Sequence, residues 1–323
     1  MKNTSRLDGA YAPILTPFTS DRSTIDWESY RRHLSFLEKE GLNGILVLGT
    51  NGEFGRLTIE ERIQLVEATI ATGTTLKLII GGVVPDSPEE TMTFVARLAD
   101  YADQLAAVLV APPFFDEVAA GRTIPEDSVV DFYRKLANVQ DRIPLMLYNV
   151  PVPAGGPVTA AIPPRVVAAL SDEAVIMGIK DSTACLENIP AYREAKLGLQ
   201  VLVGNDHVMA EGFAHGAAGS ITACGNVFPS AVLTVHQSAS GPDRETAQAE
   251  LSDLRRILEL IPGKMVATQK LLLHHFGTVS TRSPVRDRDQ ELTIAEQDQV
   301  LARLEQTVAG LAINQMIQLA IRR

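Results

Sequence analysis

Lys180 is the residue whose position most directly suggests chemistry. It follows the apolar run at 174–179 and precedes Asp181 and Ser182. A strand seldom ends on a lone ammonium group, because burying an unpaired charge is costly. A desolvated lysine can lose its proton near neutral pH, and the neutral amine attacks carbonyl carbons to form a Schiff base. The alternatives are that Lys180 reaches solvent along its aliphatic stem or pairs with Asp181.

A glycine-rich segment follows another apolar run, with the sequence Gly-Thr-Asn-Gly-Glu-Phe at 49–54. A turn of this composition presents backbone N–H groups, and with the side chains of Thr50 and Asn51 it would hold a carboxylate. The alternative is an ordinary turn between a strand and a helix. Thr50 and Asn51 are therefore candidate substrate-binding residues.

Tyr148 stands at the end of a third apolar run, directly before Asn149. A tyrosine at a strand end is often a half-buried packing residue. If it faces the same site as Lys180, its hydroxyl would move protons to and from a carbinolamine. Ser182 follows Lys180 by two residues, and the small residues at 216–220 would leave room for a ligand beside the lysine.

The elements that would position these residues alternate regularly along the chain. The predicted strands are 10–15, 44–48, 76–80, 106–111, 144–148, 175–179, 200–203 and 219–222. The predicted helices between them are 26–40, 58–72, 87–103, 125–138, 163–170, 186–197 and 206–217. Two of these helices begin with a capping signal. Thr58 and Glu61 form a capping box at the start of one, and Ser87 followed by proline begins the other.

This alternation predicts an α/β fold, a parallel (β/α)8 TIM barrel, whose active sites lie at the C-terminal ends of the strands. The strand runs are too uniformly apolar for half-exposed antiparallel strands. A doubly wound open sheet is the competing fold. It is disfavoured because no Gly-x-Gly-x-x-Gly segment opens the first unit, and eight units are many for it.

The alternation stops at Val227, and the rest of the chain predicts helices at 230–240, 243–261, 264–276 and 293–320. The first of these would complete the barrel. We therefore expect residues 1–240 to form the barrel and residues 241–323 to form a C-terminal helical appendage packed on it. No linker or low-complexity segment marks a separate domain.

Composition excludes several classes of protein. The chain has 323 residues, 46% of them hydrophobic and 21% charged, as in globular proteins. A formal charge of −10 argues against a nucleic-acid surface. The two cysteines and six histidines form no CxxC or HExxH motif, which predicts no metal site. No signal-like or membrane-spanning run occurs, so a cytoplasmic protein is expected.

Four motifs occur in order on the predicted units: Gly-Thr-Asn-Gly-Glu at 49–53, Tyr-Asn-Val-Pro at 148–151, Gly-Ile-Lys-Asp-Ser at 178–182, and Gly-Asn-Asp at 204–206 followed by Gly-Ser-Ile-Thr at 219–222. Together they resemble the dihydrodipicolinate synthase / N-acetylneuraminate lyase family of class I aldolases, over roughly residues 9–304. The resemblance implies a Schiff base with a 2-oxo acid, usually pyruvate, without a cofactor. It also implies a homotetramer or homodimer.

The resemblance also implies a role for each matching residue. Lys180 would form the imine and Tyr148 would relay protons. Thr50 would serve both catalysis and, with Asn51, binding of the pyruvyl carboxylate. The remaining predicted substrate-binding residues are Ser182, Gly204 and Ile221, the last through a backbone carbonyl near the nucleophile.

Three departures from the family pattern narrow the expected substrate. Dihydrodipicolinate synthases carry a second threonine where this chain has Asn51. They place an arginine at the position of Pro153, where it receives the carboxylate of the second substrate. Their strand-four loop holds a tyrosine that a neighbouring subunit uses, whereas this chain has Phe114 and Phe115. Asn51, Phe54 and the triplet at 180–182 look more like 4-hydroxy-2-oxoglutarate aldolase and its relatives.

The leading hypothesis is therefore a lyase that makes or breaks a C–C bond next to pyruvate, in 4-hydroxy-2-oxoglutarate or a 2-keto-3-deoxy sugar acid. Its partners would be pyruvate and a small aldehyde or 2-oxo acid. Three alternatives stay open: a dihydrodipicolinate synthase, a dehydratase of a deoxy sugar acid, and a non-enzymatic 2-oxo acid sensor. Intact Lys180 and Tyr148 argue against the sensor. The loop at 114–126 would shape the pocket of the second substrate.

Overall fold

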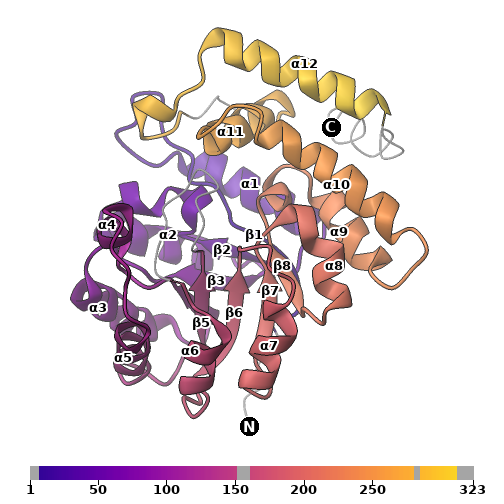
Figure 1. The fold of residues 1–323 in the computed structure, drawn as a ribbon. Helices are drawn as coiled ribbons and strands as arrows, with labels where there is room; N and C mark the ends of the chain where they lie inside the picture. Colours follow the sequence, from indigo (N-terminus) through magenta and orange to yellow (C-terminus); the bar gives the residue numbers. More distant parts are fainter. Residues whose placement is uncertain (1–6, 151–160, 280–283, 311–323) are drawn as a thin grey trace. The chain divides into compact units, whose positions relative to one another are not determined.

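A computed structural model describes residues 7–150, 161–279 and 284–310 of the protein. Parallel strands form a closed barrel in the order β1 to β8, with helices between successive strands (Figure 1). The strands are β1 Gly9–Ala12, β2 Gly44–Val47, β3 Lys77–Gly81, β4 Leu105–Val110, β5 Leu145–Asn149, β6 Ile176–Asp181, β7 Gln200–Val203 and β8 Gly219–Ile221. The predicted TIM barrel is confirmed.

The helices follow the strands along the chain and continue beyond β8. The α-helices are α1 Trp27–Lys39, α2 Ile59–Ala71, α3 Pro88–Leu98, α4 Phe115–Ala119, α5 Glu126–Ala137, α6 Pro164–Ala169, α7 Asn188–Ala195, α8 Met209–Ala214, α9 Pro229–Ser238, α10 Arg244–Leu258, α11 Met265–His275 and α12 Ile294–Gly310. The 3₁₀ turns are η1 Thr50–Gly52, η2 Phe54–Arg56, η3 Ala99–Tyr101, η4 Asp206–Val208, η5 Ala223–Asn226 and η6 Arg288–Gln290.

Side-chain caps explain where several helices begin. At α2, the Thr58 hydroxyl accepts from the Glu61 N–H and the Glu61 carboxylate accepts from the Thr58 N–H, which confirms the predicted capping box. At α3, Ser87 caps the helix and proline occupies its first turn, where a missing N–H costs nothing. Asp26 caps α1 in the same manner through the Ser29 N–H.

The chain divides into two compact units, and each is described by itself. One unit comprises Met1–Gly9 and Lys77–Ile221, which contain strands β3 to β8. Every residue of β4 is buried, as expected for a parallel strand covered on both faces. The neighbouring helices α5, α6 and α7 contact one another in sequence, and α7 lies against β7 (Figure 1). This unit carries Lys180 and Tyr148.

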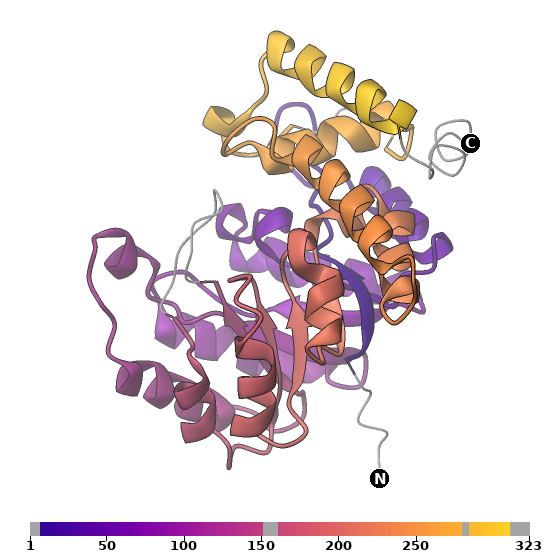
Figure 2. The ribbon, with the colours of Figure 1, turned by 45° about the vertical axis from the view of Figure 1, so that its right-hand side comes forward.

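The other unit comprises Ala10–Leu76 and Thr222–Arg323. It contains the paired strands β1 and β2, with Tyr11 opposite Gly44, and the C-terminal helices. Helix α10 packs against α9, α11 and α12, and α11 also contacts α12 (orange to yellow in Figure 2). This unit carries the glycine-rich segment at 49–53. The predicted domain boundary at residue 240 stays a prediction.

Two strands end at least two residues away from the predicted position. Strand β1 ends at Ala12 rather than at residue 15, because Pro13 follows and proline has no N–H for the ladder. Strand β6 continues through Lys180 and Asp181 rather than ending at residue 179. Both residues have register partners in β5 and in β7, so the ladder extends past the apolar run. Lys180 is therefore part of the barrel wall.

Candidate active site

The register of β5 and β6 places Tyr148 beside Lys180. The two residues are direct partners across the strands. Lys180 Nζ donates a hydrogen bond to the Tyr148 hydroxyl at 3.3 Å and lies 4.4 Å from the centre of the Tyr148 ring. Lys180 is only 6% exposed, which excludes the alternative that its ammonium group reaches solvent. The arrangement joins a buried amine to a hydroxyl that can pass protons.

The next residues along both strands, Asn149 and Asp181, are also register partners and are buried. Side chains alternate across a strand, so this pair points to the face opposite Lys180. The Asp181 carboxylate accepts from the Thr183 N–H at 2.9 Å and from Asn188 Nδ2 at 3.0 Å. These partners hold Asp181 away from the lysine. No ion pair between Lys180 and Asp181 is present in the described structure, and the second alternative for Lys180 is wrong.

Tyr192 of α7 completes this outer network. Its hydroxyl accepts from Asn149 Nδ2 at 2.8 Å and donates to the Ile162 carbonyl at 2.7 Å. Burial and the nearby Asp181 carboxylate raise the pKa of Tyr192, so it stays a protonated donor. The network ties the ends of β5 and β6 to α7. It thereby fixes the backbone on which Lys180 and Tyr148 stand.

Gly204, directly after β7, packs against the stem of the lysine. Its N–H donates to the Asp181 carbonyl at 2.7 Å, and its carbonyl accepts from Ser182 Oγ at 3.4 Å. A Cβ atom at this position would lie 3.0 Å from Lys180 Cε and 2.1 Å from Ser182 Oγ. Only glycine therefore fits here without displacing either side chain. Ser182 and Gly204 thus bond to each other beside the stem of Lys180, and their predicted role in substrate binding stays a prediction.

Lys270 of α11 is a second buried lysine, which sequence analysis did not single out. It is 3% exposed, and its Nζ lies 2.5 Å from Glu53 Oε1 and 2.8 Å from the Pro284 carbonyl. Burial lowers the pKa of Lys270, while the Glu53 carboxylate opposes this shift. Its Nζ is thus occupied by the contacts with Glu53 and Pro284. Lys180 differs because its hydrogen-bond partner in the described structure is a hydroxyl.

The segment at 49–53 forms η1 in the other unit. Asn51 is 5% exposed, and its Nδ2 donates to Gln269 Oε1 of α11 at 3.4 Å. Thr50 is partly exposed. The Gly52 carbonyl accepts from Thr16 Oγ1 at 2.7 Å. The first N–H groups of such a turn have no acceptor within it, so the turn offers donors as well as the two polar side chains.

Glu53 ends this segment in the left-handed backbone region, at φ 55°. This conformation costs a non-glycine residue about 1–2 kcal/mol. Glu53 Oε1 pairs with Lys270, and Oε2 accepts from the Arg286 N–H at 2.8 Å. These contacts give Glu53 a structural role, which is to tie the turn to α11 and to the residues before η6.

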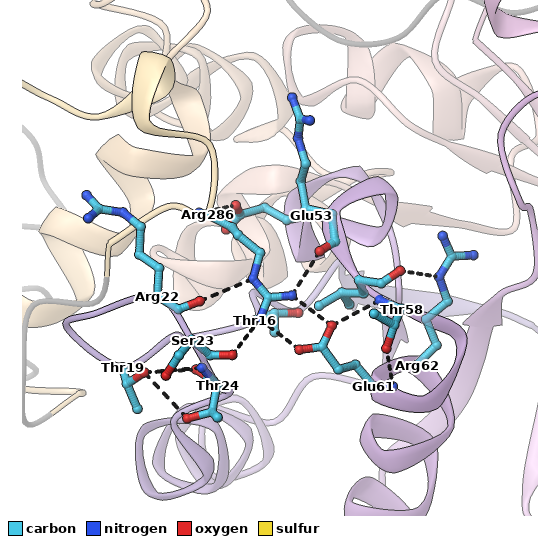
Figure 3. Close-up of polar contacts among 12 residues, drawn as sticks. Thr16, Thr19, Arg22, Ser23, Thr24, Glu53, Thr58, Glu61, Arg62 and Arg286 are labelled. Atoms are coloured by element: carbon cyan, nitrogen blue, oxygen red, sulfur yellow. Dashed lines mark hydrogen bonds and ion pairs between the residues drawn. The ribbon is translucent and has the colours of Figure 1, made fainter.

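Arg286 extends this attachment (Figure 3). Its guanidinium pairs with both carboxylate oxygens of Glu61 at 2.7 Å and donates to the Arg56 carbonyl at 2.9 Å. It also lies 4.4 Å from the centre of the Phe18 ring. The pair with Arg286 lowers the pKa of Glu61. The start of α2 is thereby joined to the C-terminal part of the same unit.

Ile221 is the last residue of β8 and is fully buried. It belongs to the same compact unit as Lys180. The part of the chain that the structure describes holds no group of three or more His, Cys, Asp or Glu side chains placed to bind a metal ion. None of its helices is long and apolar enough to cross a bilayer.

Comparison with known proteins identifies the family. The model of the Dihydrodipicolinate synthetase family matches residues 6–307. The chain belongs to this family. An uncharacterised DapA-like lyase of Chloroflexus aurantiacus is 32% identical over 260 residues, 78% of this chain and 82% of the relative. A 4-hydroxy-tetrahydrodipicolinate synthase of Wolbachia pipientis is 29% identical over 287 residues, 86% of this chain and 90% of the relative.

Solved structures agree on the fold. A 2-keto-3-deoxygluconate aldolase variant of Sulfolobus solfataricus has a TM-score of 0.81 at 20% identity and covers 96% of this chain and 99% of its own. Dihydrodipicolinate synthase from Aquifex aeolicus has a TM-score of 0.80 at 22% identity, with coverages of 93% and 97%. As a member of the dihydrodipicolinate synthetase family, the chain is a lyase of the class I aldolase type.

Two of the departures from the dihydrodipicolinate synthase pattern lie at Phe115 and at Pro153. Phe115 begins α4 and is 8% exposed, and the neighbouring Phe114 packs edge-on against Phe132 of α5 at 6.3 Å between ring centres. Phe115 is therefore packed within its own chain. Pro153 lies outside the described residues. In the loop at 114–126, the Asp116 N–H donates to Asp86 and Arg122 is exposed.

Proposed function

We propose that the chain cleaves or forms a C–C bond next to pyruvate in a 2-oxo acid, through a Schiff base at Lys180. The observation that carries this proposal is the pair of Lys180 and Tyr148: a buried amine without a carboxylate partner in the described structure, 3.3 Å from a hydroxyl. A desolvated amine is the nucleophile that carbonyl chemistry requires. Lys270 does not fit the role because its Nζ is bonded to the Glu53 carboxylate and the Pro284 carbonyl.

In the proposed reaction, Lys180 Nζ attacks C2 of the 2-oxo acid to give a carbinolamine. Tyr148 transfers a proton to the leaving hydroxyl, and water departs to leave a protonated imine. The Tyr148 phenolate left by this transfer accepts the proton of the C4 hydroxyl, the C3–C4 bond breaks to release an aldehyde, and the bonding electrons pass into the imine to form an enamine. Protonation at C3 and hydrolysis then release pyruvate and regenerate Lys180.

The remaining candidate residues receive binding roles in this proposal. Thr50 and Asn51 would bind the substrate carboxylate through hydroxyl, amide and backbone N–H donors, and Thr50 would in addition contribute to catalysis. Ser182 and Gly204 would shape the space beside the lysine, since they bond to each other and a Cβ atom at Gly204 would meet Lys180 Cε at 3.0 Å. Ile221 would offer its backbone carbonyl near the nucleophile. No cofactor has a part in this reaction.

We further propose that the substrate is of the 4-hydroxy-2-oxoglutarate or 2-keto-3-deoxy sugar acid type. Phe115 supports this over dihydrodipicolinate synthesis, because it has no hydroxyl and packs within its own chain. The second substrate of the synthase also carries a carboxylate that calls for a cation, and the sequence has Pro153 at that position.

Product analysis tests the proposed reaction. Purified protein is incubated with 4-hydroxy-2-oxoglutarate and with 2-keto-3-deoxygluconate, and pyruvate and aldehyde are quantified by mass spectrometry. We expect equimolar pyruvate and aldehyde from at least one of the two, and none with Lys180→Ala. Loss of water without release of pyruvate would identify a dehydratase. Binding of these acids without turnover would identify a sensor.

A further inference from the structure

Helix α11 meets the segment at 49–53 through two consecutive residues. Gln269 contacts Asn51, and Lys270 contacts Glu53. Gln269 and Lys270 are 0% and 3% exposed, so both contacts are shielded from water. The ion pair of Lys270 anchors the end of the turn, as described above. The contact of Gln269 is different, because it reaches the side chain that is proposed to bind the substrate.

A chain of three buried amides fixes which atom of Gln269 faces Asn51. Asn226 Nδ2 donates to the Pro13 carbonyl at 2.8 Å, and because a carbonyl can only accept, the orientation of the Asn226 amide is determined. The same Nδ2 donates to Gln269 Oε1 at 3.0 Å. Gln269 Nε2 in turn points to the Met265 carbonyl, at 3.4 Å. Backbone carbonyls at both ends therefore orient Gln269 with its oxygen toward Asn51.

The orientation of Asn51 follows from this chain. Gln269 Oε1 accepts from Asn51 Nδ2 at 3.4 Å, so the Asn51 amide presents its nitrogen toward α11. Both Asn226 and Gln269 are fully buried, which leaves no solvent to substitute for the acceptor. A buried amide with a single fixed partner has little freedom to rotate. This bond uses one of the two Asn51 N–H donors and restrains the amide before any ligand arrives, and the second N–H can donate to a substrate carboxylate.

We propose that Gln269 is a positioning residue for recognition of the substrate carboxylate, acting through Asn51. This inference rests on the proposed function. A binding residue that is already ordered loses less conformational entropy when the ligand binds. Gln269 therefore strengthens binding of the 2-oxo acid, whereas the rate of the chemical steps at the imine depends on Lys180 and Tyr148.

Gln269→Met tests this role because methionine keeps the length and volume and removes the acceptor. Loss of one hydrogen bond corresponds to an affinity change of about tenfold. We expect KM for the cleaved 2-oxo acid, and the pyruvate concentration that half-saturates borohydride trapping at Lys180, to rise about tenfold, with kcat changed less than about threefold. Trapping of acetaldehyde at Lys180, mapped by peptide mass, should be unchanged because acetaldehyde has no carboxylate.

Gln248→Met provides a matched control. Gln248 is also buried and lies in α10, where its amide donates to Ser252 Oγ at 3.1 Å. This variant should lose stability without a change in KM. If Gln269→Met does not fold, Gln269→Asn takes its place, since it keeps the amide but is one methylene too short to reach Asn51.

A double-mutant cycle with Asn51→Ala decides whether Gln269 acts through Asn51. If it does, the substitution at 269 should have no further effect on KM once the Asn51 amide is gone. Additive effects, an unchanged KM in a folded 269 variant, or an equal loss of acetaldehyde trapping would overturn the inference. Failure of the proposed function has a different signature, because the wild-type protein would then give no pyruvate adduct at Lys180.

Discussion

Lys180 and Tyr148 face each other because their strands pair in register, with the Nζ atom 3.3 Å from the tyrosine hydroxyl. Their neighbours Asn149 and Asp181 pair in the same register on the opposite face. The pairing of β5 with β6 thus places two pairs of polar side chains on opposite faces of the sheet. The amine and the phenol lie on one side, and a hydrogen-bonded structural network lies on the other.

Tyr148→Phe should slow turnover by about 10²–10⁴-fold, the usual contribution of a positioned acid–base group. The ring and its contact with Lys180 remain, so pyruvate should still bind and form an adduct on borohydride reduction. Steady-state kinetics with the cleaved 2-oxo acid measure the effect. Tyr30→Phe is the matched control, because the Tyr30 hydroxyl is buried against Thr69 and should affect stability alone. A near-normal kcat in Tyr148→Phe would make Tyr148 a packing residue.

Gly204→Ala should reduce activity by displacing Lys180 and Ser182, since the new Cβ would lie 3.0 Å from Lys180 Cε and 2.1 Å from Ser182 Oγ. Overpacking of this kind costs about 1–3 kcal/mol of stability. We expect a folded variant with a lower Tm and a markedly smaller rate of adduct formation. Gly55→Ala, where nothing lies within 4 Å of the new Cβ, should behave as the wild type. Equal adduct rates for the two variants would refute the packing argument.

Aspartate semialdehyde should be a poor second substrate for condensation with pyruvate. The loss of a charged hydrogen bond to its carboxylate is worth roughly 1.5–3 kcal/mol, or about ten- to a hundredfold in kcat/KM. The comparison is with 4-hydroxy-2-oxoglutarate and 2-keto-3-deoxy sugar acids at matched concentrations. If aspartate semialdehyde gives the highest kcat/KM, the interpretation that Pro153 and Phe115 disfavour dihydrodipicolinate synthesis is wrong.

His33 should make the protein less stable as the pH falls from about 6.5. Burial lowers the pKa of His33 to about 4, and its Nε2 donates to the Asn226 carbonyl at 3.1 Å. Between the two pKa values the unfolded chain binds a proton that the folded chain does not, so the free energy of unfolding drops by up to about 1.4 kcal/mol per pH unit. Burial likewise lowers the pKa of His236 to about 4.

Urea unfolding of wild type and His33→Gln between pH 7 and pH 5 measures this dependence. The variant should show a shallower slope, with His236 accounting for part of what remains. A wild-type stability that does not change over this range would contradict the assignment of His33 as a buried neutral side chain.

The fold was predictable because the signals for it are local. Apolar runs in parallel strands and capped amphipathic helices such as α2 can each be recognised within about fifteen residues. Lys180, Tyr148, Ser182 and Gly204 were likewise visible as polar or small residues at predicted strand ends. Their mutual contacts then follow from the barrel order, which brings β5, β6 and β7 side by side.

The features that were missed depend on partners far away in the chain. Lys270 pairs with Glu53, which lies 217 positions earlier in the chain. The sequence of its own helix does not distinguish this lysine from an exposed polar residue. Gln269 is a similar case, since its partners are Asn51 and Asn226. The extension of β6 through Lys180 depends on the registers of two neighbouring strands. Local periodicity carries no information on any of these contacts.

Borohydride reduction in the presence of pyruvate tests the central claim most directly. Intact mass and peptide mapping should show one adduct on Lys180 in the wild type, none on Lys270, and none in Lys180→Ala. Lys270 serves as the internal control because it is also buried but is paired with Glu53. Absence of an adduct from the wild type, or an equal adduct on Lys180→Ala, would contradict a Schiff base at Lys180.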